Sequence, residues 1–293
     1  MKSIKNKNIT VLYIAGNGHS GSTLLDIIIG SSPDIFSAGE LTFITRDSIF
    51  EEYCSCGTLI KDCGIWSKVI EIWIRKSPVN LEDYKKLRLK FERNKTTARA
   101  FISKLNPSQD FKTYCEATLI LFEAIQEVTG KSVIVDSSKS PQRIAVLNKI
   151  VDLKVIHLCR NAKGVLNSAK KSSKKDIKAG IETDLPARKT SKTVLEWLFV
   201  NGITELFCIG VDSKRIKYKD YISNLEIIEE KIHPEIKVQN EQSFLAEHML
   251  AGNILRLKKN IVIDSDLGFK YNRLTKKQSR IAYLFESLFP FWS

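Results

Sequence analysis

Three short and almost continuously apolar runs stand out along the chain, and each is followed by a polar turn and then a segment with helical spacing. The runs are ITVLYIA (Ile9 to Ala15), SVIVD (Ser132 to Asp136) and LKVIHLC (Leu153 to Cys159). Near-continuous apolar strands that alternate with helices are typical of a parallel sheet covered on both faces. The pattern therefore predicts a three-layer α/β fold with a central parallel sheet flanked by helices.

Helical periodicity fills much of the segment between the first two strands. One apolar stripe at helical spacing is formed by Trp66, Val69, Ile70, Trp73 and Ile74. A second helix is expected over residues 84–99, with a basic solvated face. A third is expected from Asp110, as its cap, to Val128, with Gly130 near its end. We therefore expect a helical insertion over about residues 41–130 of a single domain that spans residues 1–293.

A stretch rich in Lys, Ser and Thr follows the third strand. Residues 170–192 have little periodicity, so we expect a mobile basic loop, followed by a helix from Val194 to Phe207. Such a loop is most often only a solvated basic segment. The alternative is a lid that closes over a ligand and places one or two cations on it.

The chain is basic, which favours anionic partners but does not say which kind. Its 293 residues include 46 Lys and Arg against 33 Asp and Glu, a formal charge of +13. Such a charge suits nucleic acid, a membrane surface or an anionic small ligand. The run from Leu24 to Ile29 is far shorter than the roughly 20 apolar residues of a membrane span. The amino terminus also lacks a secretory signal pattern, so a cytoplasmic protein is expected.

The loop after the first strand, GNGHSG, carries a candidate anion site. Gly16, Gly21 and Thr23 occupy the glycine and hydroxyl positions of a P-loop, but Ser22 stands where that motif has its lysine. The missing lysine argues against an ordinary NTPase, which uses it on the β and γ phosphates. Backbone N–H groups, two hydroxyls and a helix N-terminus remain. Together they can hold one tetrahedral anion in a P-loop-like fold.

Two segments in this order resemble a known family. GNGHSGSTLL is similar to the 5′-phosphosulfate loop of PAPS-dependent sulfotransferases, and RNAKGVLNS, with Arg160 and Ser168 eight residues apart, resembles their 3′-phosphate site. The similarity is to a bacterial branch that resembles tyrosylprotein-type and natural-product sulfotransferases. It implies the donor 3′-phosphoadenosine 5′-phosphosulfate (PAPS), with a cofactor-binding set of Gly18, His19, Ser20, Gly21, Ser22, Thr23, Arg160 and Ser168.

The same resemblance indicates three catalytic residues. Glu40 lies 21 residues after His19, a spacing similar to that of the glutamate base in tyrosylprotein sulfotransferases. Lys139, in SSKSP, resembles the lysine that those enzymes place on the bridging oxygen of the donor. His19 departs from the family, where Arg or Lys is usual. Either the anion pocket keeps its imidazole charged, or the ring acts as a neutral hydrogen-bond donor.

The resemblance implies an activity and its limits. The chain is expected to be a sulfotransferase that moves a sulfuryl group from PAPS to a hydroxyl or amine of a small-molecule acceptor and releases PAP, with no metal in the reaction. A natural product such as a guanidinium alkaloid is one acceptor of this kind. Neither nucleic acid nor a membrane is an expected partner. Nothing in the sequence encodes the acceptor, the choice between O- and N-sulfation or the oligomeric state.

Two other functions fit parts of the sequence. A nucleotide kinase or NTPase with a degenerate loop would need a lysine near the phosphates and a magnesium-binding carboxylate, for which Asp136 is a candidate. A nucleic-acid-binding protein would use the charge of +13, although no reader motif is present.

The cysteines and one histidine stay outside these schemes. Cys54, Cys56 and Cys63 are spaced unlike the CxxC pairs of most four-ligand zinc sites, and the histidine nearest in sequence, His19, already belongs to the loop. We therefore expect reduced packing cysteines, or one local disulfide, and no metal site. His248, in HMLAGNILRL, is expected either beside the ligand pocket or on a helix face.

Overall fold

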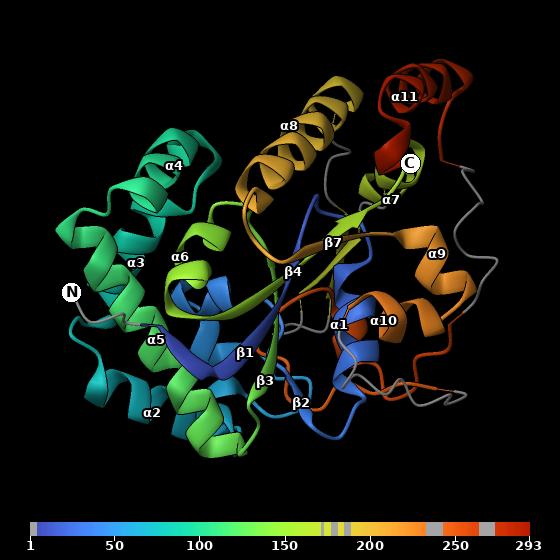
Figure 1. Cartoon of the computed structure of the whole chain (residues 1–293). Helices are drawn as coiled ribbons and strands as arrows, with labels where there is room; N and C mark the ends of the chain where they lie inside the picture. Colours follow the sequence, from blue (N-terminus) through green and yellow to red (C-terminus); the bar gives the residue numbers. More distant parts are fainter. Residues whose placement is uncertain (1–4, 171–172, 177–180, 185–188, 233–242, 264–272) are drawn as a thin grey trace.

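A five-stranded parallel sheet forms the centre of the computed structural model, which describes residues 5–170, 173–176, 181–184, 189–232, 243–263 and 273–293. The strand order is β2–β3–β1–β4–β7 (Figure 1). The strands are β1 (Asn6–Ala15), β2 (Ile35–Ser37), β3 (Val133–Lys139), β4 (Val151–Cys159) and β7 (Ser213–Lys217). Every neighbouring pair in this sheet is parallel.

The central strand shows why the sheet is covered on both faces. In β1, Val11 and Tyr13 belong to one apolar cluster and Leu12 and Ile14 to another, because successive side chains of a strand point to opposite faces. Helices α5 (Gln109–Thr129) and α6 (Arg143–Ile150) cover the first face, while α1 (Ser22–Gly30), α9 (Tyr218–Ser223) and α10 (Glu226–Lys231) cover the second (Figure 1). The predicted three-layer α/β fold is confirmed.

The segment between β2 and β3 is helical, as predicted, but its boundaries differ. It contains η1 (Leu41–Thr45), η2 (Ile49–Glu51), η3 (Ile60–Asp62), α2 (Trp66–Lys76), α3 (Leu81–Phe91), η4 (Asn94–Thr96), α4 (Thr97–Leu105) and α5. The single helix expected over residues 84–99 is wrong, because α3 ends at Phe91 and Glu92 turns into the core. Ile74 is 49% exposed and lies outside the buried stripe of α2. Ser108, not Asp110, caps α5, and Gly130 ends it as predicted.

A smaller apolar cluster packs the C-terminal helices against the helices that follow β4. It contains residues of α7 (Ala162–Ala169), α8 (Thr190–Cys208), α11 (Lys276–Leu288) and η7 (Pro290–Trp292). The rings of Trp197 and Trp292 meet edge to face, with their centroids 5.5 Å apart. Helix α8 begins at Thr190, four residues earlier than the sequence predicted.

The basic segment before α8 contains regular structure where a loop was expected. Strands β5 (Ser173–Asp176) and β6 (Ile181–Asp184) form an antiparallel pair. Residues 171–172, 177–180 and 185–188 lie outside the described residues, so the alternative of a lid stays a prediction.

All five parallel strands bring their carboxyl ends to one edge of the sheet, where ligands of open α/β sheets usually bind. The segments that leave this edge carry most of the residues singled out from the sequence. Within the described ranges, no helix combines the length and the apolar character that a membrane crossing requires.

Candidate functional site

The turn after β1 has a backbone that only small residues permit at two positions. Gly16 and Gly21 have φ of 137° and 92°, and a Cβ at Gly16 would lie 2.5 Å from the carbonyl oxygen of Leu158. A Cβ at Gly21 would lie 2.5 Å from the ring of Tyr218. A Cβ at Gly18, in contrast, would meet nothing within 4 Å. Gly16 and Gly21 are therefore required by the fold, whereas Gly18 faces open space.

Polar groups around this turn are left available to an anion. Helix α1 begins at Ser22, and its N-cap residue, Gly21, has no side chain to bond the first N–H groups of the helix. The hydroxyl of Ser20 is buried and has no hydrogen-bond partner among the described residues. An unsatisfied buried hydroxyl costs about 1–3 kcal/mol, and an anion at the turn would relieve that cost.

The residues of the second sequence motif lie against the same turn. Arg160, directly after β4, donates a hydrogen bond from Nη1 to the carbonyl oxygen of His19 at 3.0 Å. Its guanidinium also stacks 4.0 Å from the ring centre of Tyr218. Ser168, on α7, has its hydroxyl 3.5 Å from Nδ1 of His19. The structure thus brings His19, Arg160 and Ser168 together at the end of the turn.

The two remaining candidates form an ion pair on the other side of the turn. Nζ of Lys139, the last residue of β3, contacts Oε1 of Glu40. Lys139 has a left-handed backbone with φ of 69°, and its carbonyl oxygen accepts a hydrogen bond from Gly16 N–H at 3.3 Å. The N–H of Glu40 donates to the carbonyl oxygen of Ala251 at 3.1 Å. The backbone of each residue is therefore held at the sheet edge, where the two side chains pair.

Thr23 joins this pair through a segment that is distant in sequence. The N–H of Asn253 donates to Thr23 Oγ1 at 3.3 Å. A Cβ at Gly252 would lie 3.5 Å from Thr23 Oγ1 and 3.6 Å from Glu40 Oε1, so the absence of a side chain keeps this space open. One carboxylate, one ammonium group and one hydroxyl therefore meet beside the turn.

Tyr218, Tyr221 and Gly252 were missed by the sequence interpretation. Tyr221 donates a hydrogen bond from its hydroxyl to the carbonyl oxygen of Gly21 at 3.0 Å, and the ring of Tyr218 stacks against the Arg160 guanidinium. Both tyrosines follow β7, whose sequence SKRIK is mostly polar and gave no strand signal. Gly252 precedes no recognisable turn motif, so only the three-dimensional structure shows its role.

The alternative magnesium ligand is engaged elsewhere. Asp136 is fully buried, and its Oδ2 accepts a hydrogen bond from Arg143 Nε at 2.7 Å. Its Oδ1 accepts from the backbone N–H of Ser138 at 3.0 Å. A carboxylate that is sealed in this way cannot serve as the magnesium ligand of a nucleotide kinase.

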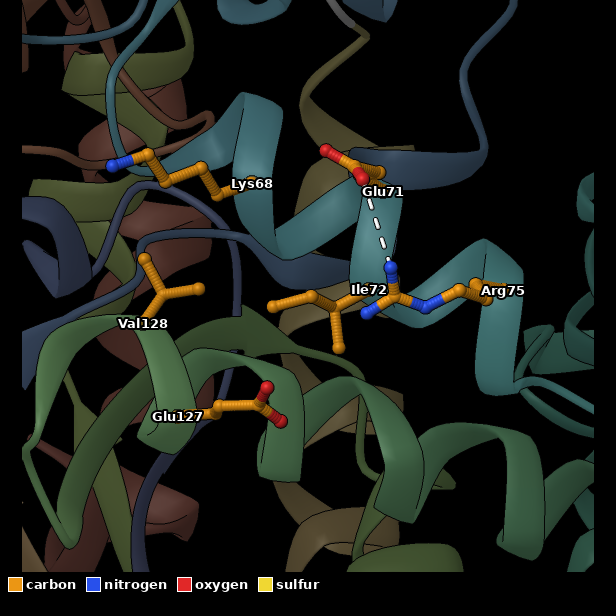
Figure 2. Close-up of a pocket in the computed structure, with 6 residues that line it drawn as sticks. All are labelled: Lys68, Glu71, Ile72, Arg75, Glu127 and Val128. Atoms are coloured by element: carbon orange, nitrogen blue, oxygen red, sulfur yellow. Dashed lines mark ion pairs between the residues drawn. The ribbon is translucent and has the colours of Figure 1, made fainter.

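A surface groove between α2 and α5 does not coincide with these residues. Figure 2 shows its lining by Lys68, Glu71, Ile72, Arg75, Glu127 and Val128. The Glu71 and Arg75 side chains pair at 3.7 Å, and Glu127 pairs with Lys76 at 2.7 Å. Glu71, Arg75 and Glu127 thus each have an ion-pair partner, and none of the candidate residues lines the groove.

Comparison with known proteins gives structural neighbours only. No protein-family model and no curated protein matches the chain. One similar solved structure is the sulfotransferase domain from the curacin biosynthetic pathway, with 15% identity, a TM-score of 0.48, and coverage of 96% of this chain and 98% of that one. Another is the sulfotransferase domain of the Synechococcus PCC 7002 olefin synthase, with 16% identity, a TM-score of 0.47, and coverage of 96% and 95%. The residues at the strand ends must therefore be judged by their own geometry.

Proposed function

We propose that the chain is a sulfotransferase that moves a sulfuryl group from PAPS to a hydroxyl or amine of a small-molecule acceptor and releases PAP. The observation that carries the proposal is the contact of Arg160 with His19. Through it, two motifs that lie 141 residues apart in sequence converge on one turn. A ligand with two separate phosphate groups matches two anion-binding groups placed side by side.

The residues around the turn fit the two ends of such a donor. The first N–H groups of α1, the orphaned hydroxyl of Ser20 and the open space at Gly18 suit the 5′-phosphosulfate. Arg160 and Ser168 suit the 3′-phosphate, because a guanidinium fork and a hydroxyl both donate to phosphate oxygens. When bound, PAPS supplies a sulfuryl group with a phosphate oxygen as its leaving group.

Glu40 and Lys139 are proposed to divide the chemistry. Glu40 accepts the proton that the acceptor's hydroxyl or amine loses, a role that typically contributes about 100-fold to 10,000-fold in rate. Lys139 holds its positive charge where negative charge builds on the leaving oxygen. The observed ion pair holds the carboxylate and the ammonium group side by side before any ligand arrives.

The acceptor is proposed to be a small molecule, with a natural product as the class to test first. The formal charge of +13 suits the anionic donor. Gly252 leaves space between Thr23 and Glu40, and an acceptor has to reach Glu40. O- and N-sulfation both place the proton to be removed near the same carboxylate.

Binding of PAP without magnesium tests the proposal. We expect PAP to raise the unfolding temperature of the wild type and ATP with magnesium to leave it unchanged. Arg160→Ala should weaken PAP binding by about 10-fold to 100-fold, the equivalent of about 1.5–3 kcal/mol for a charged hydrogen bond. Arg75→Ala, which removes an exposed guanidinium on α2, is the matched control and should bind PAP as the wild type does.

Two outcomes would overturn the proposal. One is equal PAP affinity for the wild type and Arg160→Ala, and the other is stabilisation by ATP with magnesium but not by PAP. If PAP binds as expected, incubation with PAPS and candidate acceptors, followed by mass spectrometry for the gain of one sulfonate, identifies the acceptor.

A further inference from the structure

Three cysteines and one histidine form a compact cluster away from the candidate residues. The cluster consists of Cys54, Cys56, Cys63 and His248, with one ligand atom from each residue, and all four atoms lie within 4.8 Å of one another. The sequence interpretation considered only the histidine nearest in the chain, His19, and did not place His248 beside these cysteines. Tertiary structure brings His248 to them from 185 residues beyond Cys63.

The distances within the cluster match a tetrahedral zinc site. The Cys63 sulfur lies 3.6 Å from the Cys54 sulfur, 3.8 Å from the Cys56 sulfur and 3.4 Å from Nδ1 of His248. The Cys54 sulfur lies 4.0 Å from the same nitrogen. Zinc bonds of about 2.3 Å to sulfur and about 2.1 Å to nitrogen give tetrahedral edges of about 3.8 Å and about 3.6 Å. The four atoms therefore surround a space of the size that zinc requires.

The backbone holds the first two cysteines on one tight turn. The N–H of Cys54 donates a hydrogen bond to the Thr58 carbonyl at 2.8 Å, and the N–H of Gly57 donates one to the Cys54 carbonyl at 3.0 Å. Gly57 has φ of 90°, which glycine adopts without strain. Cys54 and Cys56 thus present their sulfur atoms from a rigid support, as a preformed metal site needs.

The other two members are also fixed by their neighbours. Backbone N–H groups of Ile65 and Trp66 donate hydrogen bonds to the Cys63 sulfur, as is suitable for a thiolate. The indole N–H of Trp66 donates to the His248 carbonyl at 2.5 Å. Outer contacts of this kind orient metal ligands.

We propose that Cys54, Cys56, Cys63 and His248 bind one Zn²⁺ ion in a closed tetrahedral site with a structural role. Three thiolates and one neutral imidazole nitrogen fill the four positions that zinc prefers, so none is left for a reacting molecule. The three thiols release their protons to solvent when the ion binds. Cys–His sites of this composition favour zinc over magnesium or calcium.

The position of the site indicates what the ion would stabilise. His248 begins the segment that runs along the edge of the candidate site. In this segment, Leu250 N–H donates to the Ala38 carbonyl at 3.0 Å, and the Ala251 carbonyl accepts from Glu40 N–H at 3.1 Å. The ion would therefore fasten the turn at residues 54–63 to the segment that supports Glu40.

Metal analysis of the purified full chain tests the site. Protein expressed with added zinc and purified without chelator should contain one zinc per chain, and Cys63→Ser should lose most of it. Cys208→Ser, in α8, is the matched control and should keep the full amount. Chelation of the ion should lower the unfolding temperature of the wild type and of Cys208→Ser alike.

Cobalt spectroscopy keeps the proposal testable if Cys63→Ser does not fold. The wild type titrated with Co²⁺ should develop thiolate-to-cobalt charge-transfer bands and the intense visible bands of tetrahedral cobalt, saturating at one equivalent. His248→Cys, which replaces one zinc ligand type by another, should retain a tetrahedral spectrum. His248→Ala should alter it.

Several results would overturn the zinc site. The first is that the wild type contains no zinc and shows no charge-transfer bands with cobalt. The second is that Cys63→Ser keeps the wild-type zinc content. The third is that the intact mass shows a disulfide between two of the three cysteines. These measurements use neither donor nor acceptor. The zinc site can therefore fail while the proposed sulfuryl transfer stands, and the reverse also holds.

Discussion

Two carboxylate–cation pairs lie at the carboxyl end of β3 and differ in how deeply their side chains are buried. Asp136 and Lys139 are three residues apart on this strand. Asp136 pairs with Arg143 at 2.7 Å, and Arg143 also reaches Glu92 at 3.0 Å, with side chains no more than 1% exposed. Lys139 pairs with Glu40 at the sheet edge, where the side chains are 22% and 9% exposed.

The surroundings of each pair indicate different roles. The Arg143 pair is enclosed by the core, and Tyr114 donates a further hydrogen bond to Glu92 at 2.7 Å. Lys139 instead has a left-handed backbone, which costs about 1–3 kcal/mol in a residue other than glycine. Strain of this kind persists where the surrounding structure enforces it and is concentrated at functional sites. The buried pair therefore supports the fold, and the pair at the edge is available to a ligand.

A further carboxylate nearby has no cation partner among the residues that the structure describes. Asp26, on α1, is fully buried and accepts hydrogen bonds from the hydroxyls of Ser37 and Ser137, each at 2.6 Å. Burial raises its pKa to about 7, because the charged form loses its hydration. Asp136, Glu40 and Asp26 thus form a series: a carboxylate in a fully enclosed pair, one in a pair at the open edge, and a buried acid with no countercharge within the described part of the chain.

The largest expected effect is on the buried pair. Arg143→Met leaves Asp136 and Glu92 as two buried carboxylates without a cation, and we expect the free energy of unfolding to fall by about 3–5 kcal/mol. Urea unfolding measures this loss. If the variant is insoluble, Arg143→Lys, which restores one charge but not the guanidinium fork, should show an intermediate loss.

The matched control for the buried pair is an exposed one. Arg75 pairs with Glu71 one turn apart on α2, and Arg75→Met should change the free energy of unfolding by no more than about 0.5 kcal/mol. Equal losses for the Arg143 and Arg75 variants would show that burial does not distinguish the pairs.

The next effect separates rate from stability at the sheet edge. Under the proposed function, Lys139→Met should lower kcat for sulfuryl transfer by about 100-fold to 1000-fold, because it removes the positive charge proposed to lie beside the leaving oxygen. Its free energy of unfolding should fall by only about 1–2 kcal/mol, since the pair is partly solvated. Steady-state kinetics at saturating PAPS and urea unfolding of the same variant give both quantities. A stability loss equal to that of Arg143→Met, with kcat unchanged, would assign Lys139 to the fold.

The sequence predicted the elements whose signals are local. The strands β1, β3 and β4 are apolar runs, and the spacing of Gly16, Gly21 and Thr23 identified the turn. Arg160 was expected to share a ligand with that turn, and it contacts His19 there, because parallel strands place their carboxyl ends at one edge. These features follow from short stretches of chain and need no knowledge of distant contacts.

The features that were missed depend on distant contacts. The helix expected over residues 84–99 is interrupted because Glu92 turns inward to Arg143, which is 51 residues away. Strand β7 lies at the edge of the sheet and buries only Ile216, so it lacked the apolar run of β1, β3 and β4. His248 reaches Cys63 only through the folded chain. The local periodicity of the sequence predicts none of these three features.

The smallest effect tests the acid without a countercharge. Between pH about 4 and about 7, the folded chain keeps a proton on Asp26 that the unfolded chain has lost, because the folded pKa is raised from 3.8 to about 7. The free energy of unfolding should therefore fall as pH rises through this window, by about 1.4 kcal/mol per pH unit from this group, and level off above about pH 7. Asp26→Asn cannot titrate and removes this contribution.

Urea unfolding of both proteins at about pH 5 and about pH 6 isolates the contribution of Asp26, because all other groups titrate in both. The wild type should lose about 1.4 kcal/mol more than Asp26→Asn over this interval. If the two proteins lose the same amount, Asp26 is ionised in the folded chain at these pH values. The hydroxyls of Ser37 and Ser137 would then stabilise the ionised form of Asp26 to the same degree as the guanidinium of Arg143 stabilises that of Asp136. The distinction between Asp136 and Asp26 would disappear.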